Sequence, residues 1–203
     1  YAEGLSQYGA NVVLADVDYS KCKKIALELS KKYQVDPLPI KVNISDKKSV
    51  KNLVKKTMEK YSKIDILINN AAYQGNSKIR NTQFIDLPLS IWNKAISVNL
   101  TGMFLCCQEI GRIMEKQKNG VIINISSTYG VVAPDQKIYG KSGQNAAVFY
   151  SATKSAVLNL TRYLASYWHG TGIRVNTLTP GGVEKGQDVD FIKKYSSKTM
   201  LER

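Results

Sequence analysis

The sequence predicts an α/β fold with a parallel, doubly wound sheet in a single domain spanning residues 1–203. Two observations predict it. Short aliphatic runs alternate with longer segments whose apolar residues recur at helical spacing. These short runs are apolar almost throughout, as expected of strands that are covered on both faces. The expected strands are Asn11–Asp16, Leu38–Ile44, Ile64–Ile68, Val121–Ile125 and Ile173–Thr177.

Helices are expected between these strands, with capping or stop residues at their ends. Their expected ranges are 19–33, 46–61, 88–118 and, around Tyr150, a helix that ends at His169–Gly170, after an opening segment that Gly9 stops. Ser45 is the expected N-cap of the second of these helices. The inward face of the first is expected to carry Cys22, Ile25, Ala26 and Leu29.

Composition places the chain among ordinary globular proteins, with 43% hydrophobic and 22% charged residues. It has no apolar run long enough to span a bilayer and no secretory leader at residue 1, so we expect a cytoplasmic protein without a membrane partner. The formal charge of +13 favours phosphate-bearing ligands. The lysines are spread along helical segments without a nucleic-acid-binding motif, so no nucleic-acid partner is expected.

Cysteine and histidine usage argues against metal and disulfide chemistry. The chain has three cysteines, Cys22, Cys106 and Cys107, and a single histidine, His169. These residues lack the spacing of a metal site, and an odd count in a chain without a leader does not indicate a disulfide framework. No metal is therefore expected, and Cys106 and Cys107 are interpreted as small buried residues of a helix.

A tyrosine and a lysine lie four positions apart in the run Tyr150-Ser-Ala-Thr-Lys154. On a helix they share one face. A free phenol titrates near pH 10, and a neighbouring cation stabilises its ionised form. The pair can therefore act as a general acid and base close to neutral pH. The spacing alone is common in helices, so its significance depends on the segments around it.

Five segments follow the order found in the short-chain dehydrogenase/reductase family, which this chain resembles along nearly its whole length. They are Asn69-Asn-Ala-Ala72, Val98-Asn-Leu-Thr-Gly102, Ile125-Ser-Ser-Thr-Tyr-Gly130, Tyr150–Lys154 and Arg174-Val-Asn-Thr-Leu-Thr-Pro-Gly181. Each is weak alone, but all five stand at the strand end or helix where the family has them. The resemblance implies a Rossmann-type fold and an oxidoreductase that transfers hydride between a nicotinamide and a secondary alcohol or ketone.

The resemblance assigns roles residue by residue. It implies that Tyr150 exchanges the proton, that Lys154 tunes Tyr150 and binds the nicotinamide ribose, and that Ser127 binds the reacting oxygen. Asn99 is expected to hold a water linked to Lys154, or otherwise to satisfy a bulge in its helix. The expected cofactor-binding residues are Asp16, Asn43, Ile44, Asn70, Ala71, Tyr150, Lys154, Pro180, Gly181 and Val183.

Asp16 ends its predicted strand and resembles the acidic residue by which the family selects its cofactor. A carboxylate at this place accepts hydrogen bonds from a ribose with free hydroxyls and repels a 2′-phosphate, an effect to which Asp18 adds. NAD is therefore expected rather than NADP. Asn43 stands where the family usually has an aspartate, and its amide oxygen is expected to accept a hydrogen bond from the adenine.

The family's first strand and its glycine-rich turn are absent from the printed sequence, and so is its last strand. We therefore expect a fragment with a gap of about 10 Å, two strand spacings, between the strands ending at Asp16 and Ile68. A chain beginning at Tyr1 is expected to fold poorly and to bind NAD weakly. Ala72 replaces the usual glycine, a small change.

The 22 residues 128–149 between Ser127 and Tyr150 exceed the dozen or so common in the family. The extra segment 134–145 is interpreted either as a surface insertion or as a binding loop. As a binding loop, its polar side chains favour a hydroxyl-rich substrate; they are Gln136, Lys137, Tyr139, Gln144 and Asn145. With the substrate lid expected after Gly181, the insertion resembles the flagellin-modification and nonulosonate-sugar branch, which implies a sugar or nucleotide-sugar substrate.

Alternatives to a simple dehydrogenase remain open at this stage. A dehydratase or epimerase that recycles its cofactor would carry the same motifs. A noncatalytic dinucleotide-sensing protein could share the fold, since fold alone does not determine function. The family's usual association through the helices around Asn99 and after Tyr150 implies a homodimer or homotetramer.

Overall fold

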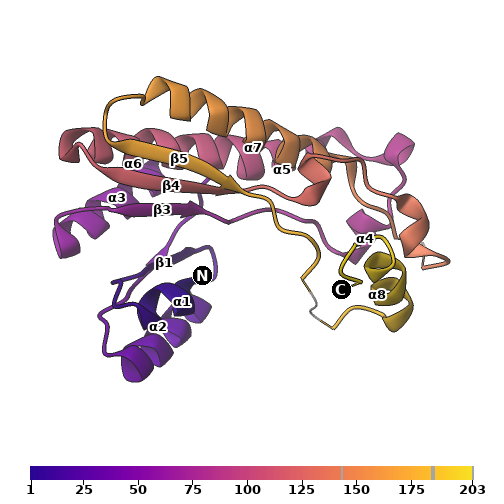
Figure 1. Ribbon diagram of the computed structural model, residues 1–203, viewed down its shortest axis with the longest axis horizontal. Coiled ribbons are helices and arrows are strands. Elements are labelled where there is room, and N and C mark those ends of the chain that lie inside the picture. Colours follow the sequence, from indigo (N-terminus) through magenta and orange to yellow (C-terminus); the bar gives the residue numbers. More distant parts are fainter. Residues whose placement is uncertain (143, 184–185, 203) are drawn as a thin grey trace.

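A computed structural model describes residues 1–142, 144–183 and 186–202. Five parallel strands form two separate sheets (Figure 1). The three-stranded sheet has the order β3-β4-β5 and the two-stranded sheet consists of β1 and β2. The strands are β1 (Val13–Asp16), β2 (Leu38–Lys41), β3 (Ile66–Asn69), β4 (Gly120–Ile125) and β5 (Ile173–Leu178). The α/β class and the parallel strands are as predicted from the sequence.

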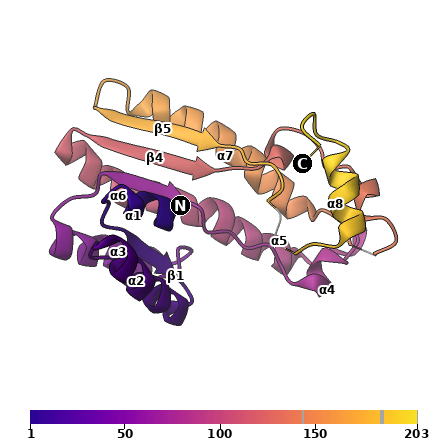
Figure 2. The same cartoon turned by 60° about the horizontal axis from the view of Figure 1, so that its bottom comes forward.

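Helices cover both sheets and extend beyond the strand ends. The α-helices are α1 (Ala2–Gln7), α2 (Tyr19–Tyr33), α3 (Lys47–Tyr61), α4 (Ser77–Arg80), α5 (Leu89–Ile96), α6 (Met103–Gln117), α7 (Val148–Tyr167) and α8 (Val189–Ser196). The 3₁₀ turns are η1 (Phe84–Asp86), η3 (Thr128–Gly130) and η4 (Gln136–Tyr139), and η2 (Ser97–Gly102) is a π-helical turn joining α5 to α6. The carboxyl ends of β3, β4 and β5 point toward α4 and α8 (Figures 1 and 2).

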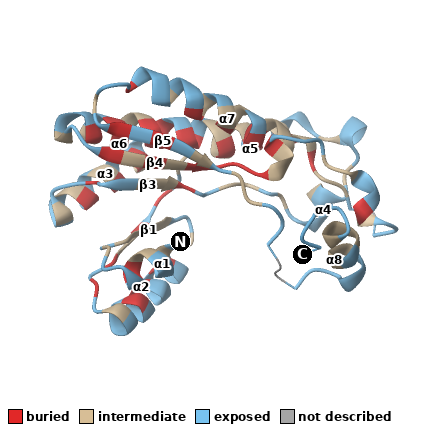
Figure 3. Cartoon of the chain, in the orientation of Figure 1, coloured by how far each residue is buried: buried red, intermediate tan, exposed pale blue. Residues whose placement is uncertain are grey.

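The main core lies around the three-stranded sheet. Its buried members include Ile122 on β4, Met114 on α6 and Val157 on α7. Trp168 closes the core at the end of α7, where an added Cβ at Gly111 would approach its ring to 2.4 Å. The two-stranded sheet has a smaller core of its own. In Figure 3 the buried residues are concentrated accordingly along β4 and the facing helices.

A cavity of about 740 Å³ separates the two sheets. One wall consists of residues of α1 and β1, including Val13 and Ala15, and the other of β3 and α3, including Ile66 and Ile68. The gap expected between the strands ending at Asp16 and Ile68 is therefore present. The facing edges of β1 and β3 pair with no other strand among the described residues.

Local differences from the sequence-based expectations have simple physical reasons. Asp46, not Ser45, caps α3, because its carboxylate accepts from the N–H groups of Lys48 and Ser49 at 3.0 and 3.3 Å. Ile25 is 40% exposed rather than buried, since a sheet of two strands covers only a narrow stripe of α2. The helix expected over 88–118 is divided by the π-helical turn η2 into α5 and α6, and α6 ends at Gln117, followed by the left-handed residue Lys118.

Candidate active site

Tyr150 and Lys154 lie in the first two turns of α7, and Lys154 extends into the protein interior. Lys154 is only 5% exposed, and its Nζ donates to the carbonyl oxygen of Ile125 at 2.6 Å. The same ammonium lies 5.6 Å from the centre of the Tyr150 ring. Burial lowers the pKa of Lys154 from 10.5 to about 8. The cation is thus held beside the phenol, and the amine of Lys154 stays mostly protonated at neutral pH.

The loop carrying Ser127 is bonded to the same turn of α7. Ser126 Oγ donates to the carbonyl oxygen of Lys154 at 2.7 Å, and Ser155 Oγ donates to that of Gly130 at 2.8 Å. Gly130 permits this contact, since a Cβ there would lie 2.7 Å from the Lys154 carbonyl oxygen. Ser127 lies between these attachment points and is 8% exposed. The final glycine of Ser-Ser-x-x-Gly therefore has a packing role.

The segment after β5 joins the same cluster. The N–H of Ser126 donates to Leu178 O at 2.9 Å, and that of Thr128 donates to Pro180 O at 3.1 Å. These bonds place Pro180, with Gly181 after it, beside the Ser127 loop. Val183, the third residue expected to flank the nicotinamide, is 73% exposed. Ser127, Pro180 and the start of α7 thus belong to one continuous site at the carboxyl ends of β4 and β5.

Asn99 lies within the π-helical turn η2 and is 3% exposed. Its side chain binds the backbone of Tyr73 twice: Oδ1 accepts from the N–H at 2.6 Å, and Nδ2 donates to the carbonyl oxygen at 3.1 Å. Nδ2 also donates to Thr153 Oγ1 at 3.3 Å, one residue before Lys154. The side chain therefore positions the loop after β3 against α7. A widened turn of this kind is common at functional sites.

Gly102 explains the second half of the Val98–Gly102 motif. A Cβ at this residue would lie 2.7 Å from Cγ1 of Ile44, so the glycine lets the loop after β2 pack against η2. Ile44 is thereby fixed in position. Asn43 is exposed, but its Oδ1 already accepts from the N–H and hydroxyl of Ser45 at 3.2 and 2.7 Å. An amide oxygen that already accepts two hydrogen bonds is poorly placed to accept a third.

A buried polar chain that sequence reasoning missed supports the site from beneath. Asn69 Nδ2 donates to Asn124 Oδ1 at 2.9 Å, and Asn124 Nδ2 donates to Thr161 Oγ1 at 3.0 Å. The chain connects β3, β4 and α7, the three elements that carry or border Tyr150, Lys154 and Ser127. The available signal was an asparagine within one apolar strand run, Asn124, and another at the end of such a run, Asn69, since buried amides require partners.

The remaining expected cofactor residues lie on the open side of the site. Asp16 is exposed at the end of β1, and its Oδ1 accepts from the N–H of Asp18 at 3.0 Å. Asn70 and Ala71 are exposed directly after β3, and Asn70 borders the cavity between the sheets. No group of His, Cys, Asp and Glu residues suited to a metal ion occurs in the described part of the chain.

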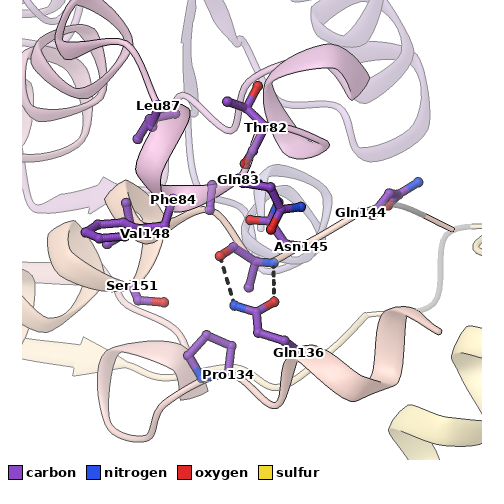
Figure 4. A pocket seen from close by; sticks show the side chains of 12 residues that line it. Thr82, Gln83, Phe84, Leu87, Pro134, Gln136, Gln144, Asn145, Val148 and Ser151 are labelled. Carbon is purple, nitrogen blue, oxygen red and sulfur yellow. Dashed lines mark hydrogen bonds between the residues drawn. The ribbon is translucent and has the colours of Figure 1, made fainter. Parts of the chain in front are cut away.

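The insertion 134–145 is fixed at its root by two of the side chains that would contact substrate if it were a binding loop. Gln136 pairs with the backbone of Ala146, Oε1 accepting from the N–H at 2.9 Å and Nε2 donating to the carbonyl oxygen at 3.3 Å (Figure 4). Asn145 Nδ2 donates to the carbonyl oxygens of Arg80 and Thr82 at 3.0 and 2.9 Å. Both amides therefore hold the insertion to the fold.

The tip of the insertion packs against α8. The rings of Tyr139 and Phe191 lie 5.5 Å apart, and Asp135 forms an ion pair with Lys198 at 3.0 Å. Tyr195 accepts a hydrogen bond from the N–H of Gly182. Burial, followed by the influence of Tyr139, raises the pKa of Tyr129 well above 10. The insertion and α8 thus form one wall beside the Ser127 loop, with the phenol rings of Tyr139 and Tyr195 in it.

The parallel strands and the polar cluster at their carboxyl ends define a dinucleotide-binding oxidoreductase fold. The sequence profile described as short chain dehydrogenase matches residues 1–194. The chain belongs to the short-chain dehydrogenase/reductase family, whose members bind a nicotinamide cofactor. None of the helices in the described ranges has the length and apolar character needed to cross a bilayer.

Two relatives illustrate the spread of the family. A 3-oxoacyl-[acyl-carrier-protein] reductase of Thermotoga maritima is 33% identical over 180 residues, which are 88% of this chain and 66% of the relative. A post-translational flagellin modification protein A of Campylobacter coli is 30% identical over 194 residues, 94% of this chain and 75% of the relative. The chain spans 66%, 53% and 77% of the lengths of three acyl-carrier-protein reductases that it matches.

Solved structures share the fold. A short-chain dehydrogenase of Leptospira borgpetersenii with bound NAD⁺ has a TM-score of 0.77 and 30% identity, covering 95% of this chain and 79% of its own. A short-chain alcohol dehydrogenase from Sinorhizobium meliloti has a TM-score of 0.86 and 26% identity, covering 100% of this chain and 76% of its own.

Proposed function

We propose that this chain is the greater part of an NAD-dependent oxidoreductase that interconverts a secondary alcohol and a ketone. The observation that carries the proposal is the buried Lys154 ammonium, held by Ile125 O at 2.6 Å and 5.6 Å from the Tyr150 ring centre. Burying a cation costs free energy, and this one forms no ion pair in the described chain that would offset the cost. A catalytic role, the stabilisation of an ionised phenol, would explain why the cation is kept there.

In the oxidative direction, Tyr150 removes the proton from the substrate hydroxyl while Lys154 stabilises the phenolate that accepts it. Ser127 binds the same oxygen and fixes the alcohol carbon in place. When bound, a nicotinamide would supply the acceptor for the hydride that leaves this carbon. In the reductive direction Tyr150 returns the proton to the carbonyl oxygen. Pro180 and Gly181, fixed beside the Ser127 loop, would border the nicotinamide. Asn99 positions the loop after β3 through its two hydrogen bonds to the backbone of Tyr73.

The carboxylates expected to lie near the adenosine favour NAD over NADP. Asp16 presents an exposed carboxylate at the end of β1, with one oxygen fixed by the N–H of Asp18 at 3.0 Å. This arrangement suits a ribose with free hydroxyls, whereas a 2′-phosphate would meet two carboxylates. The NAD⁺-bound structure at 30% identity supports this choice. Asp16→Ala should weaken NAD binding by about tenfold and reduce the preference for NAD over NADP. Glu28→Ala, on α2 beside the two-stranded sheet, should change neither the NAD affinity nor this preference.

A polar, hydroxyl-rich substrate suits the wall formed by the insertion and α8. Its phenols can donate to and accept from hydroxyl groups, and their faces can pack on a sugar ring. The similarity to a flagellin modification protein supports a sugar or nucleotide sugar. The similarity to acyl-carrier-protein reductases supports an acyl substrate instead. Assaying both substrate classes with NAD distinguishes them, and turnover of acyl thioesters alone would reject the sugar.

The decisive experiment compares Tyr150→Phe with the unaltered protein. Removing only the hydroxyl should reduce kcat by about 10²–10⁴-fold, the usual contribution of a general acid or base. NAD affinity, measured by fluorescence titration, should change less than about threefold, because the ring remains. Tyr8→Phe, which alters a phenol that is 90% exposed and lies outside the site, is the matched control. Full turnover by the Tyr150 variant would refute the mechanism.

Two other activities make different predictions. A cofactor-recycling dehydratase or epimerase would turn over substrate without net reduction of added NAD. A dinucleotide-sensing protein would bind NAD but turn nothing over. The buried Lys154 favours an enzyme over a sensor.

A homodimer or homotetramer is also proposed, supported by the stacked and exposed Tyr163 and Tyr167 on α7, with ring centres 6.1 Å apart. The cytoplasmic location stays a prediction.

A further inference from the structure

The helix α8 lies apart from the main core, beyond the carboxyl ends of the strands (Figures 1 and 2). None of its residues is buried, so it adds little apolar burial to the stability of the fold. Its aromatic side chains, Phe191 and Tyr195, lie one turn apart and stack with ring centres at 6.1 Å. Phe191 contacts the insertion, and Tyr195 contacts the turn after β5. The helix therefore connects these two segments.

The turn after β5, Pro180–Gly182, is held at both ends. The carbonyl oxygen of Pro180 accepts from the N–H of Thr128 at 3.1 Å, directly after Ser127. The N–H of Gly182 donates to the hydroxyl of Tyr195. The first bond ties the turn to the Ser127 loop and the second ties it to α8. The position of the turn thus depends on α8 as well as on the sheet.

The two glycines of this turn make room for Tyr195. A Cβ at Gly182 would lie 2.8 Å from the Tyr195 ring, and a Cβ at Gly181 would lie 3.3 Å from its hydroxyl oxygen. Neither glycine has a left-handed backbone, so neither is required by its conformation. The close approach of the tyrosine therefore accounts for the glycine at position 182.

The insertion holds α8 from the other side. The ring of Tyr139 lies 5.5 Å from that of Phe191, and Asp135 forms an ion pair with Lys198, just after the helix, at 3.0 Å. An exposed ion pair alone would stabilise this arrangement little. Together with the ring contact it fixes the orientation of the helix. A row of three rings, Tyr139, Phe191 and Tyr195, thus leads from the insertion to the turn after β5.

We propose that Tyr195 is a positioning residue for the nicotinamide, and that the insertion acts on the cofactor through it. This inference rests on the proposed oxidoreductase function, in which Pro180 and Gly181 border the nicotinamide. The Tyr195 hydroxyl acts through the Gly182 N–H and needs no contact with the reacting atoms. The adenosine, expected near Asp16 on the two-stranded side, does not depend on this turn. Loss of the hydroxyl should therefore affect only the nicotinamide end.

Exchange of the Gly182 amide proton tests the hydrogen bond without any cofactor. Tyr195→Phe removes the acceptor and retains the ring, so NMR should find exchange about fivefold faster than in the unaltered full chain. Tyr8→Phe, on a phenol that is 90% exposed, should leave the rate unchanged. Equal rates in the two variants would overturn the positioning role.

Calorimetric titration with NADH and with ADP-ribose, which lacks the nicotinamide, tests the consequence. Tyr195→Phe should weaken NADH binding by about fivefold, the effect of one lost hydrogen bond, and change ADP-ribose binding by less than about twofold. Equal weakening of both ligands would indicate general damage and overturn the proposal, as would unchanged NADH binding. Full turnover by Tyr150→Phe would refute the proposed function but would not alter these ratios, so the two failures can be told apart.

A double-mutant cycle tests whether Gly182 acts through Tyr195. Gly182→Ala would displace the tyrosine ring and should weaken NADH binding by about as much as Tyr195→Phe does. In the Tyr195→Ala protein the same change should cost less than about twofold, because the ring is gone. Gly4→Ala, on α1 with no atom within 4 Å of an added Cβ, is the matched control. A full effect of Gly182→Ala without the ring would overturn the proposal, since the glycine would then act independently of Tyr195.

Discussion

The three-stranded and two-stranded sheets of this protein are stabilised by different means. Around β3, β4 and β5, a large apolar core is combined with the buried chain of Asn69, Asn124 and Thr161. Around β1 and β2, a small core is supplemented by surface ion pairs such as Lys32–Glu3 at 2.7 Å. Exposed ion pairs contribute little to stability. The two-stranded part is therefore the weaker one.

This difference separates the proposed catalytic residues from the residue that would select the cofactor. Lys154, Ser127 and the positioning residue Asn99 are buried on the strongly packed side, where a displaced side chain would be costly. Asp16, which would select the cofactor, stands exposed on the weakly packed side. The cavity of about 740 Å³ lies between them. The proposed catalytic groups are thus fixed by the fold, whereas the proposed adenosine contacts depend on the less stable part.

The largest expected effect compares two buried isoleucines in urea unfolding. Ile122→Ala, in β4 at 0% exposure, should lower the free energy of unfolding by about 4 kcal/mol. Ile40→Ala, in β2 at 3% exposure, should cost only about 2 kcal/mol, because the small core around it can collapse more easily. Equal costs at the two positions would contradict the difference in packing between the sheets.

Much of this arrangement could be predicted from the sequence, because it depends on local patterns. Strand runs, helical spacing and the four-residue interval from Tyr150 to Lys154 are local, and they predicted the fold class and family that are confirmed here. The proximity of the Ser127 loop to α7 was expected only from the order of motifs. The structure adds the reason, two hydroxyl-to-carbonyl bonds and the close approach at Gly130.

What could not be predicted depends on contacts between distant residues. Gln136 and Asn145 would bind substrate if the insertion were a binding loop, yet each is bonded to backbone groups that no local pattern identifies. Asp46 and Ser45 are both competent caps, and only the backbone geometry selects Asp46. The partner of Asn124 lies 37 residues away in sequence. The roles of the individual site residues stay predictions until they are tested.

A smaller effect is expected from pH. Burial lowers the pKa of Lys154 from 10.5 to about 8, so between these values the unfolded chain binds a proton that the folded protein does not. The contribution of Lys154 to stability should therefore rise by up to about 3 kcal/mol as the pH increases from about 8 to 10.5, whereas the raised pKa values of the buried Cys106 and Cys107 act in the opposite direction. Lys154→Met should remove this rise, measured as the difference in stability between the unaltered protein and the variant in urea titrations at the two pH values.

The matched control for this pH effect lies on the two-stranded side. The hydrogen bond to Glu3 raises the pKa of the exposed Lys32, the opposite direction. Any stabilisation by Lys32 is fully present below pH 10.5 and would be lost only above it. Lys32→Met should therefore leave the rise between pH 8 and 10.5 intact. A rise that survives in the Lys154 variant would show that another group causes it.

The smallest expected effect is a difference in the alkylation rates of the cysteines, which tests the two sides without mutation. Burial raises the pKa of Cys107 to about 12 and that of Cys106 to about 11, and both lie on α6 against the three-stranded sheet. Cys22, on α2, is also buried, with a raised pKa.

Because thiolates react only when exposed, iodoacetamide should modify Cys22 through local opening, and Cys106 and Cys107 only through global unfolding. Mass spectrometry should find Cys22 alkylated at least several times faster at pH 8 in the absence of urea. If Cys106 or Cys107 reacted first, the three-stranded side would be the one that opens, and the proposed division between a rigid catalytic side and a weaker cofactor-selecting side would be wrong.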